Sequence, residues 1–333
     1  MKKIITLLLI AAIAVIGCFC FAACQKEKSD DVIRVNEVTH SVFYAPLYVA
    51  INKGYFEENG LKIELTNGGG SDKSMTALIS GNADIALLGP ETSVYVNAQG
   101  SANTAKIIGQ LTQKDGSFLI GRNEEKNFKW SDLRGKEVIG GRRGGMPAMC
   151  LEYAIYQNGL IDGTDVFINY DVQFDLITAA FESGVGDYCT MFEPAASQYR
   201  SEGKGYIVSS VGAEVGNVAY TCFMATEKYI SGNGDKVLLF MKSIVKAMDF
   251  CNEASNKEIA QAVAPSFATT DVSLLEKAIE SYRSIDAWAK KAYMTEESFS
   301  HLQNVLLRAG TIKEKVAYSE VVCNDVLDEI YKK

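Results

Sequence analysis

Two carboxylates stand beside prolines where short apolar runs end. Glu193 follows the apolar run that ends at Phe192, and Glu91 follows Gly89 and Pro90. A carboxylate at such a point can accept hydrogen bonds from an amino group or a ring N–H of a ligand. It can equally act on its own helix, because the helix dipole stabilises a negative charge at an N-terminus. We favour the ligand role for Glu193 and rank Glu91 below it, with Gly89, Pro90 and Phe192 as neighbouring candidates.

Two glycine-rich turns precede expected helices. One runs from Gly68 through Gly70 and Ser71 to Asp72, and the other is Gly144-Gly145-Met146. Free backbone N–H groups and the helix dipole at such turns can hold a polar or anionic ligand atom. The alternative is that both turns only cap helices. We favour binding, because the internal repeat described below gives the two turns matching places in the two lobes, on facing edges of a cleft.

Charged and aromatic residues complete the candidate set. Arg142 and Arg143 could clamp a carboxylate, sulfonate or phosphate, but two adjacent side chains cannot easily both point inward, and we select Arg142. Phe43 and Tyr44 lie in the first loop, where aromatic rings could stack on a planar ligand. Aromatic rings, a carboxylate and backbone donors together suit a planar nitrogen heterocycle better than a small inorganic anion.

The sequence lacks the motifs of most enzymes and metal sites. It contains two histidines, His40 and His301, and neither belongs to a zinc-binding, calcium-binding or nucleophile-elbow motif. We therefore expect no metal, no cofactor and no enzyme activity. The net charge of −8 argues against a nucleic-acid partner.

An internal repeat organises the chain. Ser80-Gly81-Asn82-Ala83-Asp84 has a counterpart in Ser183-Gly184-Val185-Gly186-Asp187, and each is followed by an apolar run and a proline. Upstream of them, Asn59-Gly60-Leu61 matches Asn158-Gly159-Leu160. Two related α/β lobes are predicted, each with ligand-binding loops at the carboxyl ends of its strands. Chance recurrence of common turn residues is the alternative.

The N-terminus has the pattern of an export signal. A basic start at 1–3 and an apolar stretch at 4–21 precede Ala22-Ala23-Cys24 and a polar run. We predict a signal peptide over residues 1–24, with Cys24 as the lipidated residue. Cys18 is the alternative lipidation site, and an uncleaved anchor helix is the alternative to cleavage. The five later cysteines are widely spaced and are predicted to be buried free thiols.

Several segments resemble one known family. Tyr44–Ala50, Lys53–Phe56, Gly60–Glu64 and Leu78–Ala86 are similar to the substrate-binding components of ABC importers in the nitrate, sulfonate and thiamine-precursor group, also called SsuA/THI5-like or NMT1-like. The resemblance covers about residues 32–225. It implies an α/β fold with two lobes of the type II periplasmic-binding-protein class, each a mostly parallel sheet flanked by helices.

The resemblance also implies an organisation and a function. Residues 32–114 with 222–333 would form lobe 1, and 115–221 would form lobe 2. The protein would be an extracytoplasmic, lipid-anchored monomer that passes a small molecule to ABC permease subunits. A thiamine-type pyrimidine and a sulfonate-like anion are both allowed as solutes.

Two rival functions stay open. The resembled group includes a pyrimidine synthase, whose activity needs a His and Cys cluster that the body of this chain lacks. A lipoprotein that senses a ligand without a permease cannot be separated from an importer component by sequence.

Overall fold

The computed structural model describes residues 31–100 and 104–332 of the chain. The predicted signal peptide, with Cys18 and Cys24, lies outside these residues. Within the described ranges, every helix is too short or too polar to cross a bilayer.

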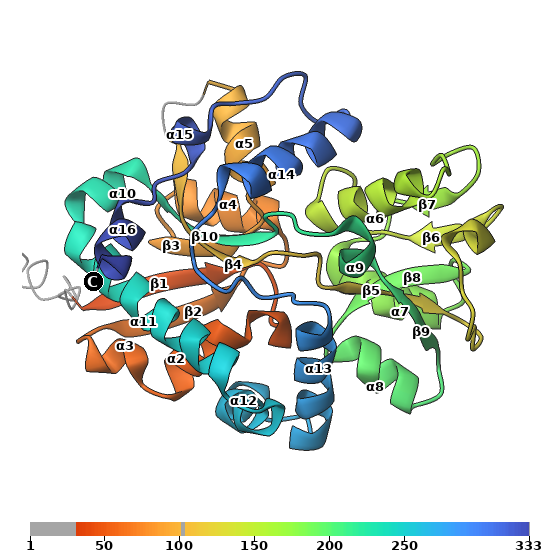
Figure 1. Ribbon diagram of the computed structural model, residues 1–333, viewed down its shortest axis with the longest axis horizontal. Coiled ribbons are helices and arrows are strands. Elements are labelled where there is room, and N and C mark those ends of the chain that lie inside the picture. Colours follow the sequence, from red (N-terminus) through yellow and green to blue (C-terminus); the bar gives the residue numbers. More distant parts are fainter. Residues whose placement is uncertain (1–30, 101–103, 333) are drawn as a thin grey trace, which may run out of the picture. The chain divides into compact units, whose positions relative to one another are not determined.

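The first lobe is built on a five-stranded mixed sheet (Figure 1). The neighbouring β1 and β3 run parallel, whereas β10 runs antiparallel to both β3 and β4. β3 is a fully buried run of four apolar residues, as expected of a strand covered on both faces. In spatial order the strands are β2 (Lys62–Asn67), β1 (Val32–Glu37), β3 (Ile85–Leu88), β10 (Thr221–Thr226) and β4 (Ala105–Thr112).

The second lobe repeats this arrangement with other strands. β7, β6 and β8 run parallel, and β5 runs antiparallel to β8 and β9. The predicted two-lobed α/β class is therefore confirmed, with each sheet mixed because one strand arrives from the other lobe. The spatial order is β7 (Phe167–Asn169), β6 (Glu137–Ile139), β8 (Tyr188–Phe192), β5 (Ser117–Gly121) and β9 (Tyr206–Ser210).

The chain passes between the sheets twice. It leaves the first sheet after β4 and enters the second as β5, and it returns through α9 (Val211–Val215) into β10. The two strands that complete a crossing, β5 and β10, are the ones that run antiparallel in their sheets.

The internal repeat has a structural basis in two aspartates. The Asp84 carboxylate accepts a 2.9 Å hydrogen bond from the backbone N–H of Arg34, and Asp187 accepts one of the same length from Glu137. In return, each aspartate N–H donates to the carbonyl of the same partner at 2.8 Å. Each Ser-Gly-x-x-Asp motif thus fixes the turn before β3 or β8 to the neighbouring strand.

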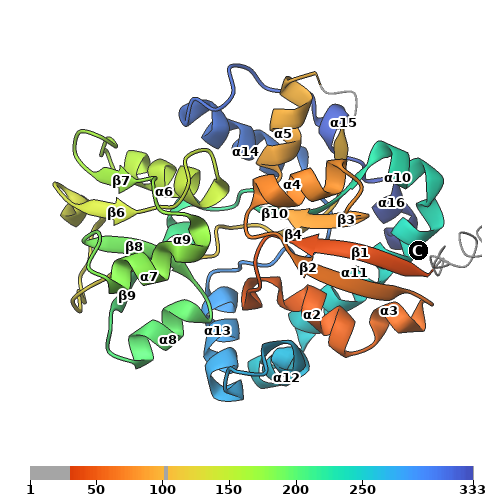
Figure 2. The same ribbon diagram turned by 180° about the vertical axis from the view of Figure 1, so that it is seen from behind.

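Helices cover both lobes (Figures 1 and 2). α2 and α3 pack with the long α11 on one side of the first sheet, and α4 and α5 lie on the other side. The first-lobe helices are α2 (Ala45–Asn52), α3 (Tyr55–Glu58), α4 (Ser71–Ile79) and α5 (Glu91–Ala98), after the 3₁₀ turn η1 (Val42–Tyr44). The second lobe has α6 (Met146–Gln157), α7 (Ile177–Glu182) and α8 (Ala195–Ser201) besides α9, with the turns η2 (Trp130–Leu133) and η3 (Phe174–Leu176).

The C-terminal part is helical, and two of its helices touch both lobes. α13 contacts η1 and α8, and α14 contacts α5 and α6. The Tyr282 hydroxyl of α13 accepts a 2.8 Å hydrogen bond from the backbone N–H of Glu193. These elements are α10 (Glu227–Gly232), α11 (Gly234–Glu253), α12 (Asn256–Val263), η4 (Ala264–Phe267), α13 (Val272–Ser284), α14 (Glu296–Arg308), α15 (Tyr318–Val321) and α16 (Asp325–Tyr331).

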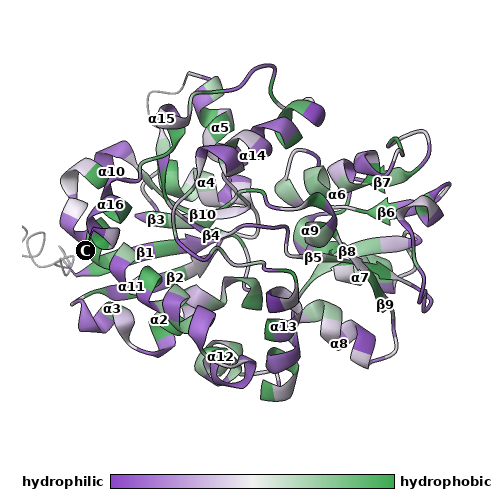
Figure 3. Cartoon of the chain, in the orientation of Figure 1, coloured by the Kyte–Doolittle hydropathy of each residue, from purple (hydrophilic) through white to green (hydrophobic). Residues whose placement is uncertain are grey.

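Burial follows the hydropathy of the sequence. Hydrophobic residues gather on the strands and on the inner helix faces, and hydrophilic residues mark the outer faces (Figure 3). The five described cysteines are free thiols, as predicted. Cys323 is only partly buried, whereas the other four are buried.

Candidate functional site

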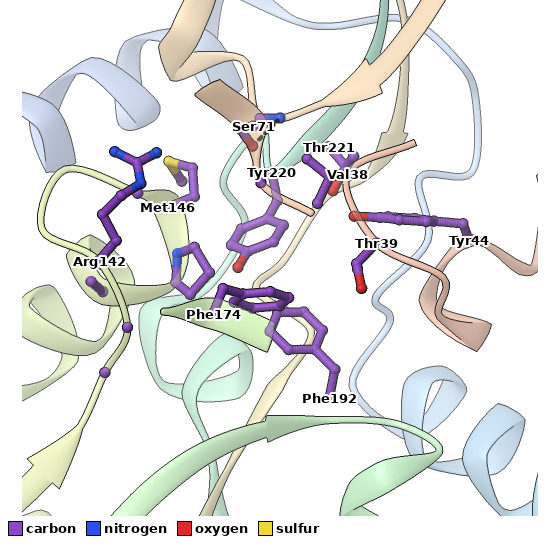
Figure 4. Close-up of a pocket in the computed structure, with 17 residues that line it drawn as sticks. Val38, Thr39, Tyr44, Ser71, Arg142, Met146, Phe174, Phe192, Tyr220 and Thr221 are labelled. Carbon is purple, nitrogen blue, oxygen red and sulfur yellow. Dashed lines mark hydrogen bonds between the residues drawn. The ribbon is translucent and has the colours of Figure 1, made fainter. Parts of the chain in front are cut away.

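A cavity of about 60 Å³ lies where the two lobes meet the crossing segments (Figure 4). The first lobe contributes the loop after β1, Tyr44 of η1, the start of α4 and the end of β3. The second lobe contributes the β6–α6 turn, Phe174 and Phe192. Tyr220 and Thr221 come from the returning crossing.

Aromatic rings form much of the cavity wall. The rings of Phe174 and Phe192 meet edge to face at a centroid distance of 5.4 Å, and Phe192 lies 6.5 Å from Tyr220. Figure 4 shows these three rings next to one another, with the Tyr44 hydroxyl pointing towards the centre of the group. This wall offers flat apolar surface from both lobes, which suits stacking on a planar molecule.

The polar part of the wall is built on backbone groups. α4 begins directly after Gly70, which has φ of 152° and accepts no side chain without strain. Ser71 is the first residue of this helix, and its hydroxyl accepts a 3.2 Å hydrogen bond from the N–H of Gly89. Gly145 similarly precedes α6, with Pro147 in the first turn.

The one charged side chain among the described cavity-lining residues is Arg142. Its Nη2 lies 3.2 Å from Oδ1 of Asp72, which belongs to the other lobe. The two side chains are 38% and 54% exposed. The Arg142 charge is therefore already matched by a carboxylate.

Two further hydrogen bonds join the lobes beside the cavity. The Tyr95 hydroxyl donates to the carbonyl of Gly144 at 3.1 Å, and the Ser41 hydroxyl donates to the carbonyl of Glu193 at 2.7 Å. Opening of the lobes would have to break both of these bonds and the Arg142–Asp72 pair.

The structure brings some of the sequence-predicted residues to the cavity and leaves others outside its lining. Those that line it are Tyr44, Gly70, Ser71, Gly89, Arg142, Gly145, Met146 and Phe192. Those that do not are Phe43, Asp72, Pro90, Glu91, Gly144 and Glu193.

Phe43 supports the cavity from behind. Its ring is fully buried and lies 5.6 Å from Phe192, 5.7 Å from Tyr220 and 5.0 Å from Tyr282. Of the two aromatic residues that were predicted to stack on a ligand, Tyr44 lines the cavity. Phe43 does not line it and instead packs against the lining rings of Phe192 and Tyr220. Pro90 precedes α5 as its cap residue.

The Glu193 carboxylate is engaged by serines of α8 and α13, Ser197 and Ser281. It accepts hydrogen bonds from the N–H of Ser197 at 2.9 Å and from the Ser197 hydroxyl at 2.7 Å. Burial raises the pKa of Glu193, and the Ser197 bonds oppose that rise. The geometry thus favours the helix-terminus role over ligand contact.

Glu91 lies behind the cavity wall without such partners. Both carboxylate oxygens are buried with no hydrogen bond of ordinary geometry. Burial raises its pKa to about 8, whereas its own N–H, the Arg142 charge and the N–H of Met146 act in the opposite direction.

The prediction that the two glycine-rich turns are equivalent positions of the repeat is wrong. The strand order matches β1 with β6 and β2 with β7, so α6 corresponds to the η1–α2 segment and α4 to α7. Both turns line the cavity. Gly70 follows β2 and Gly145 follows β6, and these two strands are not equivalent in the repeat.

Two lining aromatic residues were missed. Phe174 follows β7 in a loop, and Tyr220 lies in the returning crossing. The internal repeat could have indicated Phe174, because its segment is the counterpart of the Gly68–Ser71 turn after β2. No local pattern marks Tyr220.

Comparison with known proteins identifies relatives along most of the chain. The family model described as NMT1/THI5 like matches residues 42–257. YtlA of Bacillus subtilis (strain 168), whose name describes a binding protein, is 39% identical over 312 residues, covering 94% of this chain and 93% of YtlA. The 4-amino-5-hydroxymethyl-2-methylpyrimidine phosphate synthase of Aspergillus parasiticus is 28% identical over 220 residues, covering 62% of this chain and 63% of the synthase.

Solved structures share the fold at low sequence identity. The ligand-binding component of an ABC-type import system from Staphylococcus aureus, with zinc bound, has a TM-score of 0.73 at 15% identity, covering 91% of this chain and 100% of that one. The alkanesulfonate-binding protein SsuA from Xanthomonas axonopodis pv. citri, bound to MOPS, has a TM-score of 0.72 at 15% identity and covers 88% and 98%.

Proposed function

Because the chain belongs to the NMT1/THI5-like family, we propose that it is an extracytoplasmic solute-binding protein that delivers a small molecule to an ABC importer. The cavity between two lobes supports this function, since a ligand that contacts both lobes favours their closed arrangement by its differential affinity. Capture and release then need no covalent chemistry.

The solute that the cavity suits best is a planar nitrogen heterocycle, with a thiamine-type pyrimidine as the leading example. One observation carries this choice: Tyr44, Phe174, Phe192 and Tyr220 line the cavity, while its one charged side chain, Arg142, is paired with Asp72. Aromatic faces bind a flat ring, and backbone groups near Ser71 and Met146 can bond its nitrogen atoms.

A sulfonate-like anion is the second solute class. The SsuA likeness favours it at the level of fold, and Arg142 could supply the positive charge. An anion would have to compete with Asp72 for Arg142, which weakens this alternative. Ligand-binding roles for Gly70, Ser71, Gly89, Gly145 and Met146 are part of the proposal for either class.

An enzyme of the pyrimidine-synthase type is a weaker alternative. The fungal synthase is a distant relative. Among the described residues that line the cavity there is no His, Cys or Lys. The lining therefore offers surfaces for binding, but no nucleophile paired with a general base.

Delivery of a solute to an importer requires permease subunits as partners and a position at the membrane. ABC permease subunits would receive the solute, and a lipid on Cys24 would keep the monomer at the membrane surface. A sensor lipoprotein would use the same cavity, and the presence of permease and ATPase genes beside this one would separate the two roles.

Thermal unfolding against a solute panel tests the function. The panel should hold 4-amino-5-hydroxymethyl-2-methylpyrimidine, other pyrimidines, flavins, alkanesulfonates, nitrate and amino acids. A ligand at about one hundred times its dissociation constant stabilises the native state by ~2.7 kcal/mol. A shift with pyrimidines that Phe174→Ala abolishes supports the proposal, and a shift with sulfonates alone refutes the heterocycle assignment.

A further inference from the structure

Glu91 is a buried carboxylate with weak partners only: its own N–H, the N–H of Met146 and the charge of Arg142. The residue is 1% exposed, and neither carboxylate oxygen makes a hydrogen bond of ordinary geometry. The side chain folds back over Gly89: an ideal Cβ on Gly89 would lie 2.0 Å from Oε2 of Glu91. Because Gly89 lines the cavity, the carboxylate sits directly behind the cavity wall.

The groups around Glu91 come from both lobes. Arg142 stabilises its charge and Asp72 opposes it, and these two form an ion pair with each other, so their effects largely cancel. The other titratable groups that interact with it are uncharged near neutral pH, because burial raises the pKa of each: Tyr44, Tyr95, Cys150 and Cys222. Arg142 and the N–H groups of Glu91 and Met146 favour a negative charge at Glu91, but they do not offset the cost of burying it.

Part of this enclosure belongs to the second lobe. Arg142, Met146 and Cys150 lie on α6 and the turn before it, whereas Glu91 begins α5 of the first lobe. When the lobes separate, water replaces these neighbours and the carboxyl returns towards its ordinary pKa of 4.5. Between that value and about 8, the closed form therefore binds more protons than the open form.

We propose that Glu91 is a proton-operated latch: its protonation closes the two lobes, and its ionisation loosens them. As pH rises through the window between the open-state and closed-state pKa values, the closure equilibrium weakens by up to tenfold per pH unit. Coupling of the latch to solute capture rests on the proposed function, and it makes the solute and one proton co-ligands of the closed state.

Small-angle X-ray scattering of the solute-free protein from pH 5 to pH 9 tests the latch. We expect the wild-type protein to be compact at pH 5 and to expand as pH rises towards 9. Glu91→Gln, which cannot ionise, should stay compact throughout. Glu193→Gln removes the buried carboxylate of the other lobe and should keep the wild-type pH response. If the glutamine variant does not fold, Glu91→Ala replaces it.

Two results would overturn the latch. One is a wild-type protein with the same dimensions at pH 5 and pH 9, and the other is a pH response that survives in the Glu91 variants. Since no solute is present, a failed solute panel counts against the proposed function and leaves this test untouched.

Discussion

In each lobe a glutamate is buried beside the proline that caps a helix, Pro90 for α5 and Pro194 for α8, and the two carboxylates differ in their hydrogen bonds. Both residues are 1% exposed. The Glu193 carboxylate receives two hydrogen bonds from Ser197, and the Glu91 carboxylate receives none of ordinary geometry.

The difference comes from the position of each residue relative to its helix. Glu193 precedes the cap residue Pro194, so its side chain can reach the free N–H of the third helical residue, Ser197. Glu91 is itself the first helical residue, and its side chain turns back over Gly89 instead. Relative to the start of its helix, Glu193 lies two positions earlier than Glu91. This difference makes the Glu193 carboxylate a helix cap and leaves the Glu91 carboxylate able to respond to pH.

The stability of the protein should depend strongly on pH through Glu91. The Glu91 pKa is raised from 4.5 to about 8 in the native state, so its contribution to stability is fully present below 4.5 and is lost as pH rises through 8. At pH 9, Glu91→Gln should therefore exceed the wild type in free energy of unfolding by up to on the order of 5 kcal/mol, a ceiling set by the free energy that opening of the lobes costs, with little difference at pH 4.5. Chemical denaturation at the two pH values measures this, and equal stabilities at pH 9 would contradict it.

A second effect tests the packing of Glu91 on Gly89. Gly89→Ala places a methyl group within 2.0 Å of Oε2 of Glu91, and overpacking of this kind costs about 1–3 kcal/mol. The double variant Gly89→Ala/Glu91→Ala removes the clashing carboxylate and should recover most of that loss. If the double variant is no more stable than Gly89→Ala alone, the carboxylate does not occupy this space.

A third effect concerns the cap in the second lobe. Glu193→Ala removes both bonds to Ser197 and should lower the free energy of unfolding by about 1–2 kcal/mol. Glu193→Gln retains an acceptor and should lose less. Solute affinity should change little in either variant; a large loss of affinity with full stability would restore the ligand role.

The fold could be predicted where local chemistry decides it. The Ser-Gly-x-x-Asp turns and the apolar runs after them indicated a repeat of two α/β lobes, and the structure has this repeat. The antiparallel direction of β5 and β10 was not predicted. The direction of each of these strands depends on the position that it takes in the sheet of the other lobe. Residues near the strand in sequence do not determine that position.

The candidate site was harder to predict. Gly70 and Gly145 were predicted correctly as residues of the site. Glycine-rich turns before helices expose backbone N–H donors, and such turns can be recognised in the sequence. Ranking Glu193 above Glu91 as a ligand residue was a choice between positions that look alike in sequence. Their roles depend on which residue begins the helix and on what the other lobe brings near, and neither is set by neighbouring residues.

A fourth test changes the charges near Glu91 and leaves Glu91 itself in place. Asp72 raises the Glu91 pKa and Arg142 lowers it, so Asp72→Asn should move the midpoint of the pH response down and Arg142→Gln should move it up. Each shift should be at most about one pH unit, because both side chains are partly exposed and screened by solvent. Scattering against pH gives the two midpoints, and shifts in the same direction would mean that loss of the ion pair, rather than charge at Glu91, controls closure.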